Sequence, residues 1–92
     1  MKQKISEDEI NHLFEIILKL ETIEDCKILF DDLCTIQEVE KMAERIRTAE
    51  MLLEGKTYNE VMQITDTSSA TLSRVSRCVQ YGKGYQKFLK KI

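Results

Sequence analysis

Apolar residues recur along this chain at spacings of three and four positions, which is the period of one face of an α-helix. Such stripes run through residues 7–21, 23–33 and 36–54, and alternation with the two-residue period of a strand is weak throughout. The members of the three stripes are Ile10, Leu13, Phe14, Ile17 and Leu20; Cys26, Leu29, Phe30 and Leu33; and Val39, Met42, Ala43, Ile46, Ala49, Met51, Leu52 and Leu53. The pattern predicts an all-α protein with a helix over each range.

Helix starts are marked by Ser or Thr followed three residues later by an acidic side chain, the capping-box spacing that satisfies two free backbone N–H groups. The matching pairs are Ser6 with Glu9, Thr22 with Asp25, Thr35 with Glu38 and Thr57 with Glu60. Gly55 is placed to end the third helix, because glycine tolerates the positive φ of a C-cap. Two short helices and a last one over residues 84–91 are expected to follow.

Residues 57–74 have the pattern of a helix-turn-helix. Val61, Met62 and Ile64 are expected to face inward from its first helix. Thr65-Asp66-Thr67 is expected to form a tight turn, with Asp66 in the left-handed region that aspartate visits more readily than most residues. Ser68 would cap the second helix, held to the first by Leu72, Val75 and Val79.

This packing leaves an outward face of small polar and basic residues on the second helix. Its members are Ser69, Ala70, Ser73, Arg74 and Arg77. Small residues at a helix N-terminus allow the backbone to approach DNA, and the helix dipole favours phosphate there. Arginines one turn later can reach phosphates or guanine. The segment is therefore predicted to bind double-stranded DNA.

The charge distribution supports a polyanionic partner. Residues 1–54 carry 7 basic and 14 acidic side chains, whereas residues 55–92 carry 7 basic and 2 acidic ones, within a net charge of −2. Such asymmetry between halves indicates that the basic half meets nucleic acid. The alternative is a solvated face of lysines, which the helix-turn-helix pattern in the same segment disfavours.

The composition argues against a membrane protein, a secreted protein, a metalloprotein and an enzyme. No apolar run approaches the roughly 18 residues of a membrane span, and the start is too polar for a signal peptide, which predicts a cytoplasmic protein. Cys26, Cys34 and Cys78 are widely spaced and are expected to be free and buried, and His12 is the only histidine. We therefore expect no metal, no cofactor and no enzymatic activity.

The segment from Phe30 to about Gln80 resembles the Trp repressor family and, more narrowly, its YerC/YecD type. The resemblance rests on Glu44-Arg-Ile-Arg-Thr-Ala-Glu-Met-Leu-Leu-Glu-Gly55 and on Ala70-Thr-Leu-Ser-Arg74. It implies a six-helix fold and an intertwined homodimer that binds a pseudo-palindromic operator. We expect one domain over residues 1–92, with dimerisation helices over 1–54, the helix-turn-helix over 55–80 and a C-terminal helix over 81–92. A monomer whose stripes pack on each other is the alternative.

The resemblance also implies site residues. Base-contact positions carry over to Asn59, Ser69, Ala70 and Ser73, and Arg77 is added from helix geometry. The complete set of predicted DNA-binding residues is Asn59, Ser68, Ser69, Ala70, Thr71, Ser73, Arg74 and Arg77.

A ligand site is implied as well, because tryptophan-binding members hold the ligand between two arginines, with a threonine on its carboxylate. The matching residues are Arg45, Arg74 and Thr35, and Val75 and Cys78 stand at neighbouring ligand positions. Val75 replaces a glycine, Cys78 a serine and Asp32 a leucine. These changes favour an amino-acid-like corepressor other than tryptophan, or none.

One rival function stays open from the sequence, in which the hairpin is an adaptor that binds another protein of the transcription machinery. Weak salt dependence of DNA binding would support it, since neutralising phosphates makes DNA affinity fall steeply with salt.

Overall fold

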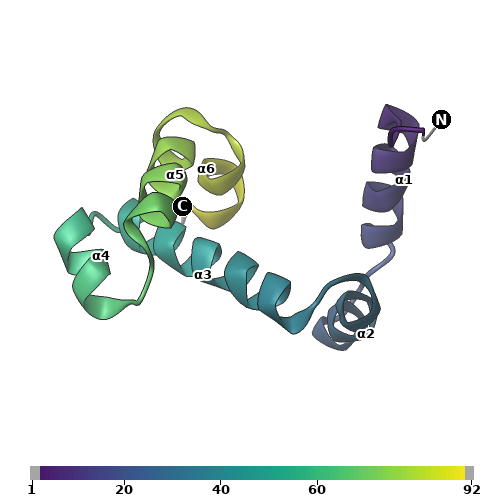
Figure 1. The fold of residues 1–92 in the computed structure, drawn as a ribbon, viewed down its shortest axis with the longest axis horizontal. Helices are drawn as coiled ribbons and strands as arrows, with labels where there is room; N and C mark the ends of the chain where they lie inside the picture. The colour runs from purple at the N-terminus through teal and green to yellow at the C-terminus, as the bar shows by residue number, and fades with distance from the viewer. Residues whose placement is uncertain (1–2, 91–92) are drawn as a thin grey trace. The chain divides into compact units, whose positions relative to one another are not determined.

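The structure is a computed structural model that describes residues 3–90. These residues form six helices and no strand, which confirms the predicted all-α, six-helix fold (Figure 1). The helices are α1 (Glu7–Ile17), α2 (Ile23–Leu33), α3 (Ile36–Leu53), α4 (Tyr58–Ile64), α5 (Ser69–Tyr81) and α6 (Gly84–Leu89). The chain divides into two compact units, Met1–Thr35 and Ile36–Ile92. The predicted functional division at residues 54 and 80 stays a prediction.

The predicted caps set the starts of α1 and α2. The Ser6 hydroxyl accepts the Glu9 N–H at 3.2 Å, and the Glu9 carboxylate accepts the Ser6 N–H at 3.1 Å, which completes a capping box. The Thr22 hydroxyl accepts the Asp25 N–H at 3.0 Å. Because aspartate is shorter than glutamate, this second cap is not reciprocal, and Asp25 instead accepts the N–H of Glu21 at 3.0 Å.

The first helix is shorter than the apolar stripe predicts. It ends at Ile17 rather than at residue 21, and the N–H groups of Lys19 and Leu20 turn back to the carbonyls of Ile16 and Ile17. The next residues lead into the extended backbone of the Thr22 cap. Helix α1 therefore stops before the extended backbone that the N-cap of α2 requires, although the apolar spacing continues to Leu20.

Neither helix of the N-terminal unit buries its apolar stripe. No residue of α1 or α2 is buried, and Phe14 remains 54% exposed and Ile23 77% exposed. Cys26, expected to be buried, is also exposed, whereas Cys34 and Cys78 are half-buried; all three thiols are free. The two apolar stripes do form helices, as predicted. The packing within a single chain, however, leaves their apolar side chains uncovered.

In the C-terminal unit, α3 is the element on which the other helices pack. It contacts α4, α5 and α6, and α5 also contacts α6 (Figure 1). The fully buried core is small and comes from three of these helices: Ala49 of α3, Val61 of α4, and Leu72 and Val75 of α5. This core fixes α4 and α5 against a single helix, which is the scaffold a helix-turn-helix needs.

Gly55 ends α3 as predicted. Its φ is +96°, its N–H donates to the Leu52 carbonyl, and the N–H of Lys56 donates to the Met51 carbonyl, each at 3.1 Å. These two bonds form a Schellman cap, which closes the helix and turns the chain towards α4.

We expect Gly55→Ala to destabilise the protein by about 1 kcal/mol, because a Cβ strains the left-handed conformation. No neighbouring atom lies within 4 Å of that Cβ, so the cost is conformational rather than steric. Gly84→Ala is the matched control, since its Cβ also meets open space and its φ is not positive. Urea unfolding of both variants tests this, and equal midpoints would contradict it.

The last helix ends at Leu89, and the predicted end at Lys91 lies outside the described residues. Among residues 3–90, no helix is both long and apolar enough to cross a bilayer.

Candidate DNA interface and ligand pocket

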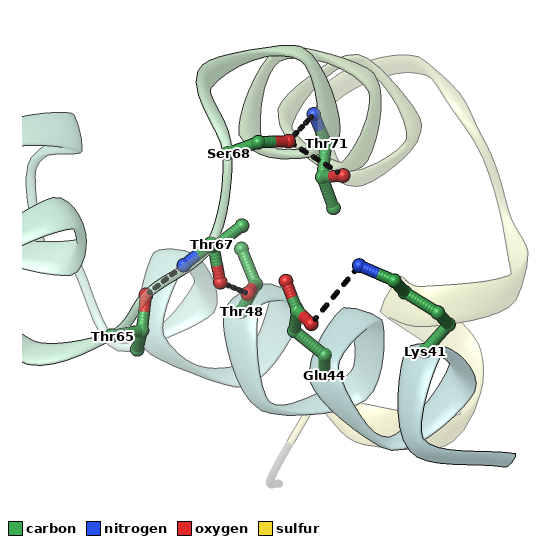
Figure 2. Close-up of polar contacts among 7 residues, drawn as sticks. All are labelled: Lys41, Glu44, Thr48, Thr65, Thr67, Ser68 and Thr71. Atoms are coloured by element: carbon green, nitrogen blue, oxygen red, sulfur yellow. Dashed lines mark hydrogen bonds and ion pairs between the residues drawn. The ribbon is translucent and has the colours of Figure 1, made fainter. Parts of the chain in front are cut away.

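Side-chain caps define both helices of the helix-turn-helix. At α4, the Thr57 hydroxyl accepts the Glu60 N–H at 3.2 Å and the Glu60 carboxylate accepts the Thr57 N–H at 3.0 Å. At α5, the Ser68 hydroxyl accepts the Thr71 N–H at 3.2 Å and donates to the Thr71 hydroxyl at 3.0 Å (Figure 2). The start of α5 is thus held by two side chains predicted as DNA contacts.

The turn between the helices is built differently from the prediction. Asp66 is not in the left-handed region, since no non-glycine residue among residues 3–90 has a positive φ. Instead, the buried Thr65 hydroxyl donates to the Val61 carbonyl at 2.9 Å and accepts the Thr67 N–H at 3.2 Å. The Thr67 hydroxyl lies 3.2 Å from the Thr48 hydroxyl of α3 (Figure 2). Threonine hydroxyls therefore satisfy the polar groups of a turn that needs no strained residue.

The inward face of the motif is narrower than predicted. Val61, Leu72 and Val75 are buried as expected, and Val79 is half-buried. Met62 and Ile64, expected to face inward, are 48% and 58% exposed. The buried face of this seven-residue helix runs through Val61 to Thr65, at a spacing of four residues, and Met62 and Ile64 lie on either side of it.

The outward face of α5 is confirmed as an exposed surface. Ser69, Ala70, Ser73, Arg74 and Arg77 are all exposed and follow one another at helical spacing. Neither Arg74 nor Arg77 forms an ion pair with another residue in 3–90. Both guanidinium groups are therefore free to meet an external anion.

The remaining predicted contacts flank this face. Asn59 is exposed on α4 and Ser68 is exposed at the start of α5, whereas Thr71 is half-buried and bonded to Ser68. Thr71 is consequently less available to a ligand than the other predicted residues.

Two acidic groups close to the motif, Glu60 and Glu44, are engaged in local interactions. Hydrogen bonds from the backbone and then the hydroxyl of Thr57 lower the pKa of Glu60. Its cap therefore contributes stability above the ordinary pKa of an unfolded glutamate, and this contribution is lost as the pH falls through the lowered value. Glu44, on α3, pairs with Lys41 at 3.9 Å (Figure 2). These interactions leave the positive charge of α5 without a compensating carboxylate among the pairs observed in residues 3–90.

A pocket of about 460 Å³ lies in the C-terminal unit, against α3, α5 and α6. Arg45 and Ile46 line it from α3, and Arg74, Val75 and Cys78 line it from α5. Residues at the end of the unit complete it: Gly82, Gly84, Tyr85, Phe88 and Leu89. Two guanidinium groups on an otherwise apolar wall suit a small molecule with one anionic end and an apolar body.

Four of the five predicted ligand residues line this pocket: Arg45, Arg74, Val75 and Cys78. Thr35 belongs to the N-terminal unit, so its part in the site stays a prediction. The sequence reasoning missed the wall formed by Tyr85, Phe88 and Leu89. The sequence predicted a helix over residues 84–91, on which these three apolar residues lie, but not that it borders a pocket.

Gly82 lines this pocket and is the C-cap of α5. Its N–H donates to the Cys78 carbonyl at 2.8 Å, and a Cβ on it would lie 2.6 Å from that same oxygen. Glycine therefore fits this helix end, where any larger residue would force its backbone to shift. Groups of three or more His, Cys, Asp or Glu side chains able to hold a metal are not found in residues 3–90.

Comparisons with known proteins agree with this architecture. The sequence profile of the family described as Trp repressor protein matches residues 8–92. The chain is 47% identical over 79 residues to the Bacillus subtilis (strain 168) protein YerC, covering 86% of this chain and 76% of that protein.

Two solved structures share the fold. One is provisionally described as a Trp repressor from Staphylococcus aureus; it has a TM-score of 0.81 and 34% identity, over 94% of this chain and 91% of that one. The other is a TrpR-like protein from Eubacterium eligens ATCC 27750, with a TM-score of 0.78 and 36% identity, over 84% and 79% of the two chains. The chain therefore belongs to the Trp repressor family, a family of regulatory DNA-binding proteins.

Proposed function

We propose that this protein is a cytoplasmic transcriptional repressor that binds a pseudo-palindromic operator as a homodimer. The observation that carries the proposal is the outward face of α5, which presents small residues at the helix start and two unpaired arginines one and two turns later. This arrangement suits major-groove recognition, in which the first residues of the second helix contact base edges and the first helix crosses the backbone.

Each part of this face has a defined role in the proposal. Ser69, Ala70 and Ser73 lie in the first turns of α5, where short side chains allow close approach to base edges. Arg74 and Arg77 neutralise phosphates, which fixes the position of the helix in the groove. Asn59 approaches DNA from α4.

The uncovered apolar stripes of α1 and α2 support a homodimer. Neither α1 nor α2 has a buried residue, and Phe14 and Leu33 remain exposed, which leaves a large apolar surface facing water. Covering it with a second copy supplies the burial that a short chain cannot supply alone.

If the dimer is obligate, its denaturation midpoint will rise with protein concentration, because unfolding then includes dissociation. Urea melts over a hundredfold range of concentration, followed by circular dichroism, test this prediction. A midpoint independent of concentration would support the monomeric alternative.

We also propose that a small amino-acid-like ligand controls DNA binding through the pocket. Arg45 and Arg74 would hold its carboxylate, and Tyr85 and Phe88 would contact its apolar body. Val75 replaces a glycine at the ring position, where its branched side chain would crowd an indole, and Cys78 replaces a serine at the position of the amino group, so tryptophan is not the expected ligand. Arg74 belongs both to the pocket and to the outer face of α5. A ligand that contacts its side chain would therefore change how the same side chain contacts DNA.

The decisive experiment is a pull-down of sheared genomic DNA by the purified protein, followed by sequencing, with and without an amino-acid mixture. A pseudo-palindrome with half-sites about 10 bp apart is the expected result. A change in enrichment on adding amino acids would support ligand control. No enrichment under either condition would overturn the proposal.

One observation favours the adaptor alternative, in which the same helices bind a protein. Met62 and Ile64 of α4 expose apolar surface that DNA binding does not require. In that case DNA affinity would be weak and would change little with salt, whereas phosphate neutralisation gives a steep decrease.

A further inference from the structure

A chain of hydroxyl groups joins the turn of the helix-turn-helix to both α4 and α3. Thr48, Thr65 and Thr67 are 0%, 8% and 5% exposed. The Thr65 hydroxyl donates to the Val61 carbonyl of α4. It also accepts the Thr67 N–H, and the Thr67 hydroxyl is hydrogen-bonded to that of Thr48 at 3.2 Å, as Figure 2 shows. The turn is thus tied to one helix through Thr65 and to the other through Thr67.

The place of this chain bears directly on the recognition helix. Thr67 is followed by Ser68, the N-cap of α5, and then by Ser69 and Ala70, the first residues of the proposed DNA face. Fixing Thr67 on Thr48 therefore fixes where α5 begins relative to α3. Figure 2 shows Thr48 on α3 pointing at the turn that leads into Ser68.

Stability alone does not account for a buried pair of hydroxyls. Two valines would have nearly the same shape, and replacing both partners of a buried hydrogen bond by apolar groups is often neutral or stabilising. What a hydrogen bond adds is direction, since it is strong only within a narrow range of distance and angle. The pair therefore provides a defined position for the turn that apolar packing around Ala49 and Leu72 would leave looser.

We propose that Thr48 is a positioning residue for DNA recognition, which holds the turn and the first residues of α5 in the DNA-binding geometry through its bond to Thr67. The proposal rests on the DNA-binding function proposed above. Thr48 is itself fully buried and does not touch DNA.

The proposed role of Thr48 affects base-specific binding to DNA and non-specific binding to DNA differently. Apparent affinity falls in proportion to the fraction of molecules in the competent geometry, so loosening the turn weakens base-specific binding. Non-specific binding depends on counterion release from phosphates and is insensitive to small shifts of the helix start. Loss of the hydroxyl pair should therefore reduce specificity while leaving the salt slope unchanged.

The test uses the full chain, a duplex containing the selected operator and a random-sequence duplex of equal length. T48V, T67V and the double variant T48V/T67V are expected to lose about tenfold in affinity for the operator, the effect of one buried hydrogen bond. Affinity for the random duplex should stay within about twofold. T48S keeps the hydroxyl and should bind like the original protein.

Two further comparisons separate positioning from folding. S76A removes a buried hydroxyl of α5 outside the turn and should leave the specificity ratio unchanged. The double variant should recover the denaturation midpoint that each single variant loses, but not the operator affinity. Recovery of both by the double variant would overturn the proposal and assign Thr48 a purely structural role.

Amide hydrogen exchange gives a readout that does not depend on DNA. In T48V, the hydrogen-bonded amides of Thr67, Thr71 and Leu72 should exchange about tenfold faster than in the original protein, while amides in the middle of α3 stay unchanged. Unchanged exchange at these amides would overturn the positioning role. A different result is that the unmodified protein shows no preference for the operator while T48V still exchanges faster at these amides. That result would count against the proposed function and not against the positioning role of Thr48.

Discussion

Replacing Arg74 with alanine is expected to weaken binding to DNA of any sequence by roughly tenfold and to reduce the salt slope by about one. Arg74 is exposed on the outer face of α5 and forms no ion pair with another described residue, so its charge is available to a phosphate. Neutralising one phosphate releases a counterion, which is why affinity and salt dependence change together. Fluorescence anisotropy at several salt concentrations measures both quantities.

Arg45→Ala is the matched control for this prediction. Arg45 lines the same pocket as Arg74 but comes from α3, outside the DNA face. Without ligand, R45A should bind DNA like the original protein, whereas any response to an amino-acid ligand should be lost in both variants. If R74A bound DNA with unchanged affinity, Arg74 would have to be removed from the interface. A loss confined to one base position would indicate a guanine contact instead of a phosphate contact.

Leu72→Ala is expected to cause the largest loss of stability, about 2–5 kcal/mol. Leu72 is fully buried and belongs to the small core that holds α4 and α5 on α3. Removing its side chain loses apolar burial and leaves a cavity that so small a core cannot refill. Urea unfolding at one fixed protein concentration measures the free energy, since the midpoint of a dimer varies with concentration.

Met62→Ala is the control, because the sequence pattern had assigned Met62 and Leu72 to the same interior. Met62 is 48% exposed, so its truncation should cost less than about 1 kcal/mol. Equal losses from the two variants would show that α4 buries Met62 in the functional protein, as contact with a second copy would do. A small loss for Leu72→Ala would contradict the observed core.

Local signals in the sequence were sufficient to identify the helices. The capping boxes at Ser6 and Thr57 and the C-cap at Gly55 depend on residues within a few positions of each other, so their spacing alone predicts them. The outward face of α5 was predictable for the same reason, since helical spacing places Ser69, Ser73 and Arg77 together once Leu72 and Val75 face inward. The family resemblance contributed Arg45 and Arg74 as pocket residues, and both line the pocket that the structure contains.

The sequence by itself thus determined where the helices start, the all-α class and the polar face of α5, because each follows from spacing and interactions within one or two turns of helix. Tertiary structure alone decided which apolar residues are buried, since Val61 and Met62 are neighbouring apolar residues of α4, yet Val61 is fully buried and Met62 is 48% exposed. It also decided the turn, where Thr48 reaches Thr67 across 19 positions of sequence, and the pocket wall at Tyr85 and Phe88. These contacts join residues distant in sequence, and no local spacing specifies which of many similar side chains will meet.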